Sequence, residues 1–173
     1  MGIFLGREKR KGDYGQYAAH RNQCKGCKPM IRRAVTEDRL DILAMCRQFH
    51  TESGVGLSFN AATAIMTIDQ VLAMKDAFVS VLDIDGALKG LFAAAILPQL
   101  FSTDRTAQEL IWWVDPAYRG RGAVKMLAEY EAWARAKGCH AINMVGLGGD
   151  PITTRLYERH GYTAQERHFL KRL

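Results

Sequence analysis

The sequence predicts an α/β fold, an α+β mixed sheet flanked by helices. Short apolar runs of strand length alternate with segments whose apolar residues recur at helical spacing. Two of the apolar runs flank Asp85-Gly86, a dipeptide typical of an antiparallel hairpin. The 173 residues, 48% of them hydrophobic, suffice for one buried core and are short for two. The predicted order of elements is β-α-α-β-β-β-α-β-α-β.

The first strand and a pair of helices are expected between residues 30 and 74. The run MIRRAV (30–35) is predicted as a strand, and Thr36 is placed to cap the helix that follows. That helix is expected to end in the glycine-rich loop TESGVGLSFN (51–60). Asn60 can then cap a second helix of similar apolar spacing.

The segment AFVSVLDIDGALKGLFAAAIL (77–97) predicts a hairpin of two strands. Asp85-Gly86 favours a type I′ turn because both central residues of that turn need positive φ. After a loop around residues 98–105, ELIWWV (109–114) is predicted as the fourth strand. Trp112 and Trp113 must point to opposite faces of a regular strand, so at least one packs in the core.

The C-terminal part is predicted to hold two helices and two strands. The segment GAVKMLAEYEAWARAKG (122–138) has one apolar face and a glycine placed to end a helix. The elements expected after it are a fifth strand in CHAINMVGL (139–147), a short helix in ITTRLYERHG (152–161) and a last strand in YTAQERHFLKRL (162–173).

The positive charge is concentrated at the N-terminus. The chain has a formal net charge of +6, and its first 33 residues hold nine lysines and arginines against two acidic residues. Residues 1–29 show no apolar period and are predicted to form a basic arm, with the compact domain over residues 30–173. Residues 1–33 would suit nucleic acid or another anionic partner, although such a segment can also be simply solvated.

No metal site and no membrane segment are predicted. Cys24 and Cys27 form one CxxC without a second ligand pair at fitting spacing, so they are expected to be free thiols. The chain has no run of about 18 apolar residues, and charge occupies the place where a signal peptide is apolar. A soluble, cytoplasmic protein is therefore expected; the sequence is compatible with a monomer or a homodimer.

The segment VDPAYRGRGAVKML (114–127) joins the fourth strand to the longest helix. Backbone N–H groups at a helix start lack intrahelical partners, and the helix dipole adds positive potential there. Gly120 and Gly122 have no Cβ to keep a phosphate from the backbone, and Arg119 and Arg121 add charge. The segment is suited to a pyrophosphate; the alternative is a glycine-rich turn with two solvated arginines.

Two segments resemble motifs of the GNAT superfamily of N-acyltransferases. Residues 114–124 are similar to its acyl-CoA motif, Arg/Gln-x-x-Gly-x-Gly/Ala after a strand ending in V-x-P, with Val124 in place of the last small residue. Residues 150–162 are similar to its N-P-x-A-x-x-L-Y-x-x-x-G-F/Y segment, with Asp150 in place of Asn and Thr153 in place of Ala. The resemblance covers residues 30–173 and implies a GNAT-like fold whose splayed strands four and five leave a cleft.

The resemblance implies an N-acetyltransferase that carries an acetyl group from acetyl-CoA to a primary amine by direct attack. Pantetheine would pair with the backbone of Trp113 and Val114, and an N–H near Val114 would polarise the thioester carbonyl. The residues that would bind the co-substrate are Trp113, Val114, Arg119, Gly120, Arg121, Gly122, Ala123, Val124 and Asp150. Short members with basic extensions occur in bacterial and bacteriophage genomes, and this chain resembles them.

Two residues are expected to carry the chemistry. Tyr157, matched to the second motif, is the expected general acid, with an ordinary half-buried aromatic as the alternative. Glu109 is the expected general base, with an exposed strand-end carboxylate as the alternative; Asp115 is another possibility, although Asp before Pro often shapes a turn. The remaining alternative function is a non-catalytic GNAT-fold module that binds through its basic arm.

Overall fold

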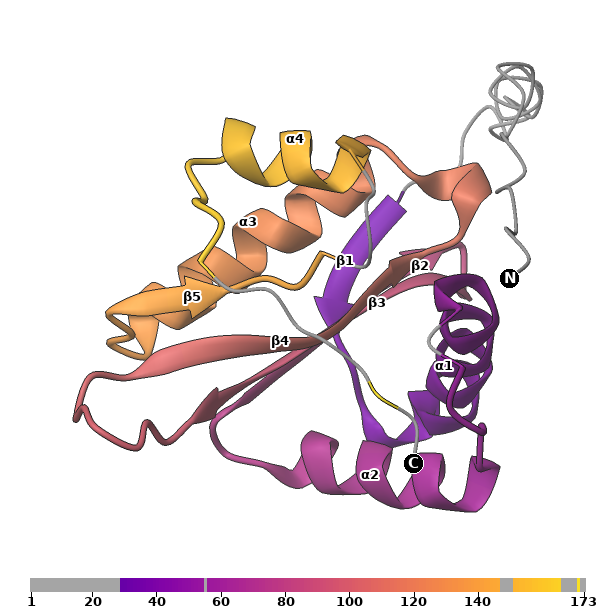
Figure 1. Ribbon diagram of the computed structural model, residues 1–173. Helices are drawn as coiled ribbons and strands as arrows, with labels where there is room; N and C mark the ends of the chain where they lie inside the picture. The colour runs from indigo at the N-terminus through magenta and orange to yellow at the C-terminus, as the bar shows by residue number, and fades with distance from the viewer. Residues whose placement is uncertain (1–28, 55, 147–150, 166–170, 172–173) are drawn as a thin grey trace, which may run out of the picture.

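The computed structural model describes residues 29–54, 56–146, 151–165 and 171 (Figure 1). Its strands are β1 (Pro29–Arg33), β2 (Ala77–Ile84), β3 (Ala87–Leu97), β4 (Thr106–Val114) and β5 (Ala141–Asn143). Its α-helices are α1 (Arg39–Ser53), α2 (Ala61–Ala73), α3 (Arg121–Ala136) and α4 (Pro151–Arg159). The predicted order of elements is confirmed from the first strand to the last helix.

The strands of the described residues form one mixed sheet in the order β1-β2-β3-β4-β5. The first four strands pair antiparallel, and β5 pairs parallel to β4. The predicted α/β fold class is therefore confirmed. The last predicted strand falls mostly on residues outside the described ones, and residues 162–165, which are described, form no strand.

Helices cover both faces of the sheet (Figure 1). On one face, Ile42, Met45 and Ile68 of α1 and α2 pack against alternate residues of β2, β3 and β4. On the other face, α3 contributes Met126, Leu127, Tyr130 and Ala134 to a second core cluster, against which Tyr162, just after α4, packs. Among the described helices, none combines the length and the apolar character needed to cross a membrane.

Local signals in the sequence predict the turns well. Asp85 and Gly86 have φ values of 52° and 86°, as the type I′ turn requires. The Asn60 side chain accepts a hydrogen bond from the Thr63 N–H at 3.0 Å, which confirms it as the cap of α2. Gly138 has positive φ where α3 ends, also as predicted, and Gly161 has positive φ just after α4.

The prediction that Thr36 caps the first helix is wrong. Thr36–Asp38 forms a single 3-10 turn, and α1 begins at Arg39. The side chain that binds backbone at this place is Asp38, whose carboxylate accepts the Val35 N–H at 2.9 Å. Asp38 reaches Val35 because it is held from the other side by an arginine of β1.

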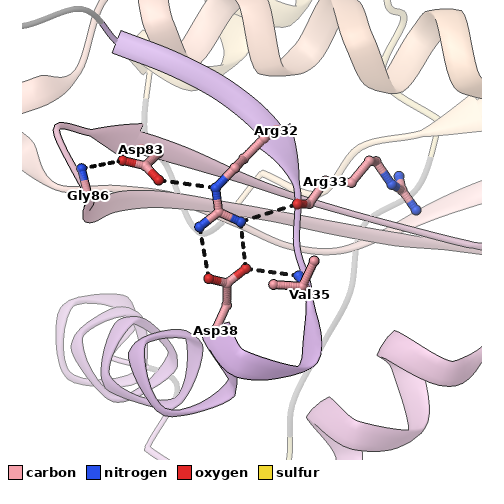
Figure 2. A network of polar contacts seen from close by, with 6 residues as sticks. All are labelled: Arg32, Arg33, Val35, Asp38, Asp83 and Gly86. Atoms are coloured by element: carbon pink, nitrogen blue, oxygen red, sulfur yellow. Dashed lines mark hydrogen bonds and ion pairs between the residues drawn. The ribbon is translucent and has the colours of Figure 1, made fainter.

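That arginine is Arg32, the centre of a polar network (Figure 2). Its guanidinium donates to both Asp38 oxygens, at 2.7 and 2.9 Å, and its Nε donates to Asp83 at 3.1 Å. The other Asp83 oxygen accepts the Gly86 N–H in the hairpin turn at 2.7 Å. The network joins β1, the start of α1 and the β2–β3 hairpin.

Candidate active site

Strands β4 and β5 diverge soon after they begin to pair. Their pairing covers only Thr106–Gln108 against Ala141–Asn143. A β-bulge follows in β4, because Ala94 pairs with Glu109 while Ala93 pairs with Ile111. From Glu109 to Val114 the β5 side of β4 has no strand partner in the described part of the chain, which is the splay that the resemblance implies.

The hydrogen-bonding direction of β4 decides which peptide groups face this opening. The Asp115 N–H donates to the Lys89 carbonyl at 2.9 Å, in register with the pairing of Val114 with Gly90. In an antiparallel ladder, hydrogen-bonded pairs alternate with non-hydrogen-bonded pairs. The N–H and carbonyl of Trp113, two residues before Asp115, therefore also point toward β3. The peptide groups of Trp112 and Val114 point the other way, into the opening.

Glu109 lies at the point where the two strands separate. Its residue is only 8% exposed, and its Oε2 accepts the Val145 N–H at 2.8 Å. Burial raises the pKa of this carboxyl to about 7, although the N–H groups of Val145 and Trp112 favour the ionised form. The expected alternative, an exposed strand-end carboxylate, does not describe this environment.

Tyr157 approaches the same place from α4. Its hydroxyl donates to the Val145 carbonyl at 3.3 Å, and its ring stacks on Trp112 with centroids 6.3 Å apart. Burial, and secondarily the charge of Glu109, raises the pKa of the phenol above its usual value. The phenol is therefore protonated at neutral pH and available as a proton donor.

The start of α3 offers unpaired backbone donors. The helical ladder begins with the Val124 N–H, which donates to the Gly120 carbonyl at 3.2 Å. The N–H groups of Arg121, Gly122 and Ala123 precede that bond and have no partner on the helix. Gly120 adopts φ 143° and ψ −133°, a conformation open to glycine and strained for other residues.

Gly122 has a packing role as well. A Cβ at this position would lie 3.3 Å from both methyl carbons of Leu82, tighter than most real contacts. The missing side chain lets the first turn of α3 lie close to the sheet. Glycine is thus explained here by packing before any ligand is considered.

Arg119 is held by two neighbours, one at the end of β4 and one on α1. Its Nε donates to the Val114 carbonyl at 2.9 Å, and its Nη2 forms an ion pair with Glu52 Oε2 at 3.0 Å. The same Glu52 oxygen accepts the indole N–H of Trp113 at 3.1 Å. The sequence did not single out Glu52, because residues 51–60 were expected to be a loop whereas α1 continues to Ser53.

The other predicted residues are placed as follows. Trp112 and Trp113 belong to the core clusters on opposite faces of the sheet, as expected. The Asp115 carboxylate accepts the Ala117 N–H at 2.9 Å and shapes a turn. Asp150 and residues 1–28, with Cys24 and Cys27, lie outside the described residues, so the roles of Asp150 and the arm stay predictions.

A family model described as the acetyltransferase (GNAT) family matches residues 44–162. The chain belongs to the GNAT acetyltransferase family. The match contains both motifs of the sequence and every element from most of α1 to the end of α4. Comparison with curated proteins gives no match.

Solved structures share this GNAT fold at low sequence identity. The aminoglycoside N-acetyltransferase AAC(6')-Iy in complex with CoA is 17% identical, with a TM-score of 0.71 over 87% of this chain and 97% of that chain. A predicted acetyltransferase from Clostridium acetobutylicum with acetyl-CoA is 16% identical, with a TM-score of 0.71 over 84% and 96%. An aminoglycoside acetyltransferase from an uncultured soil metagenomic sample, in complex with sisomicin, is 18% identical, with a TM-score of 0.66 over 84% and 96%. At this identity the likeness concerns the fold.

Proposed function

We propose that this GNAT protein is an N-acetyltransferase that transfers an acetyl group from acetyl-CoA to a primary amine by direct attack. The observation that carries the proposal is the carboxylate of Glu109, buried where β4 leaves β5 and hydrogen-bonded to Val145. A buried carboxyl whose pKa is raised to about 7 is suited to accept a proton at neutral pH.

The described residues fit acetyl-CoA as the co-substrate. The N–H groups of Arg121, Gly122 and Ala123 would bind the diphosphate at the positive end of the α3 dipole. The pantetheine amides would pair with the open edge of β4. Because the Trp113 peptide faces β3, while the Trp112 N–H bonds Glu109 and the Val114 carbonyl bonds Arg119, the proposal assigns that edge to the Trp112 carbonyl and the Val114 N–H. Asp150 is kept as a further candidate for this site.

In the proposed reaction Glu109 acts as the general base. A primary amine is mostly protonated at neutral pH and must lose a proton before its nitrogen can attack. Glu109 takes a proton from the amine, directly or through one water, and the nitrogen forms a bond to the acetyl carbonyl carbon. The Val114 N–H, which points into the opening, is placed to stabilise the developing oxyanion.

Tyr157 acts as the general acid in the second half of the reaction. The nitrogen, positively charged after the attack, loses its second proton to water as the bond between the carbonyl carbon and sulfur breaks, and the leaving thiolate receives the phenolic proton of Tyr157. The products are the N-acetylated amine and CoA as a free thiol. Tyr157 then regains a proton from solvent, and Glu109 releases the one it took.

The acceptor is proposed only as a primary amine. Two of the similar structures are aminoglycoside acetyltransferases, which makes an aminoglycoside such as sisomicin a reasonable first probe. The loops around residues 54–60 and 98–105, which lie beyond α1 and between β3 and β4, are the candidates to border the acceptor.

The test measures release of free CoA thiol from acetyl-CoA with sisomicin and a panel of simple primary amines. We expect acceptor-dependent release whose kcat/KM rises with pH to a plateau above about pH 7, the pKa of the Glu109 carboxyl. A Glu109→Gln variant should lose about 100-fold or more in kcat while still binding CoA in calorimetry. Glu37→Gln, which changes an exposed glutamate, is the matched control. Binding of CoA without turnover of any amine would favour the non-catalytic alternative.

A further inference from the structure

We infer that Glu52 is a positioning residue for the acetyl-CoA site, acting through Arg119. The inference rests on the proposed function, because it takes acetyl-CoA as the co-substrate. It adds to the proposed site a residue of α1, which packs on the face of the sheet opposite to α3. Glu52 lies in the last turn of α1, far in sequence from the acyl-CoA motif. Its carboxylate nevertheless contacts both the end of β4 and the segment that leads into α3.

The geometry around Glu52 is that of a shared acceptor. One oxygen, Oε2, accepts the Trp113 indole N–H at 3.1 Å and the Arg119 guanidinium at 3.0 Å. The indole belongs to a side chain that is only 5% exposed, so it provides a fixed anchor for the carboxylate. Glu52 is therefore held in place from the sheet and can in turn hold a more exposed arginine.

Arg119 needs such a partner to keep one orientation. Its side chain is 52% exposed, and a long exposed side chain loses considerable rotamer freedom when it is fixed. With Nε on the Val114 carbonyl and Nη2 on Glu52, the plane of the guanidinium is defined by two contacts. No described residue accepts from Nη1, which leaves that end of the guanidinium for a phosphate oxygen.

The same arrangement prepares the edge of β4. The Val114 carbonyl points into the opening between β4 and β5, where it accepts a hydrogen bond from Arg119 Nε. The Val114 N–H, on the same edge, is left for the co-substrate. Loss of Glu52 would free Arg119 and so disturb both a diphosphate contact and the end of the pantetheine edge.

The test is a double-mutant cycle on CoA binding by the full chain, measured by calorimetry. Glu52→Ala should weaken the Kd for CoA by roughly 5- to 30-fold, because charge-assisted hydrogen bonds are removed from a partly exposed site. Glu52→Gln keeps an acceptor oxygen and should recover part of the loss. In an Arg119→Ala background, Glu52→Ala should change the Kd by less than about twofold, since its effect passes through the arginine.

Controls separate positioning from folding and from the proposed function. Glu37→Ala, at an exposed glutamate of the turn before α1, should bind CoA like the wild type. Far-UV circular dichroism identifies a variant that fails to fold. If Glu52→Ala does not fold, the test uses Glu52→Gln in its place. Wild-type affinity in Glu52→Ala, or losses that multiply in the double variant, would overturn the inference. A wild type that does not bind CoA would overturn the proposed function itself.

Discussion

Glu109 and Tyr157 form hydrogen bonds with the backbone N–H and the backbone carbonyl of the same residue, Val145. The Val145 N–H donates to Glu109 at 2.8 Å, and the Val145 carbonyl accepts from the Tyr157 hydroxyl at 3.3 Å. The proposed base on β4 and the proposed acid on α4 are thus positioned by the segment that follows β5. A displacement of that segment would move both groups relative to each other.

The raised pKa of Glu109 predicts a pH-dependent stability. A carboxyl that binds its proton more tightly in the folded state favours folding at low pH, and this contribution is lost as pH rises from about 4.5 to about 7. Glu109→Gln should therefore be more stable than the wild type above pH 7, by about 3 kcal/mol, and similar to it below pH 4. Urea unfolding of both proteins at several pH values measures the difference.

The contributions of the other titrating groups to stability cancel when the wild type is compared with Glu109→Gln. Glu37→Gln, at an exposed glutamate, should follow the wild type at every pH. An unfolding free-energy difference between wild type and Glu109→Gln that stays constant from pH 4 to pH 8 would show that the Glu109 carboxyl has an ordinary pKa.

Most of the fold could be predicted because its signals are local. The Asp85-Gly86 turn, the Asn60 cap and the terminating Gly138 each depend on a few neighbouring residues. The first helix was harder, because Asp38 rather than Thr36 binds the backbone there. Asp38 is held in this position by Arg32 of β1, and no local sequence pattern identifies that partner.

The site could be predicted only in part, for the same reason. Arg119 and Tyr157 stand in recognisable motifs, but the burial of Glu109 depends on where β5 and α4 pack. The peptide direction of Trp113 depends on the register of β4 with β3, which the strand itself does not reveal. Glu52 is linked to Arg119 across 67 positions of sequence, so only the folded chain shows their contact.

Tyr157→Phe should separate acid catalysis from binding. Removal of the hydroxyl leaves the ring on Trp112 and breaks one long hydrogen bond, so stability should change by less than about 1 kcal/mol. The kcat for acetyl transfer should fall by about 100-fold with CoA affinity kept. Because the pKa of the phenol is raised, its ionisation should not limit the wild-type rate below about pH 10. Normal turnover by this variant would remove Tyr157 from its role.

Gly120→Ala should weaken both folding and CoA binding. The backbone at Gly120 has φ 143°, and a Cβ there would meet nothing within 4 Å, so the cost is conformational strain rather than a clash. We expect a loss of about 1–3 kcal/mol in unfolding free energy. CoA affinity should also fall, because Gly120 sets the direction of the first N–H groups of α3. Gly138→Ala, at φ 71° beyond the other end of that helix, should cost stability and leave CoA affinity unchanged.

Asp38→Ala should destabilise the fold far more than the loss of an exposed ion pair. Asp38 is 7% exposed, and its removal takes away the carboxylate that accepts from both Nη atoms of Arg32 and from the Val35 N–H, at a cost of about 2–3 kcal/mol. Arg135→Ala, which removes an arginine whose side chain is 73% exposed, should change stability by less than about 0.5 kcal/mol.

The destabilisation caused by Asp38→Ala should decrease at low pH. The hydrogen bond from Arg32 holds the pKa of Asp38 below its usual value, so its stabilising contribution is present above about pH 4 and lost as pH falls through the lowered pKa. The gap in unfolding free energy between wild type and Asp38→Ala should therefore narrow from pH 6 to pH 2. A gap that is the same at both ends would mean that packing of the Asp38 side chain, rather than its charge, stabilises the junction of β1 and α1.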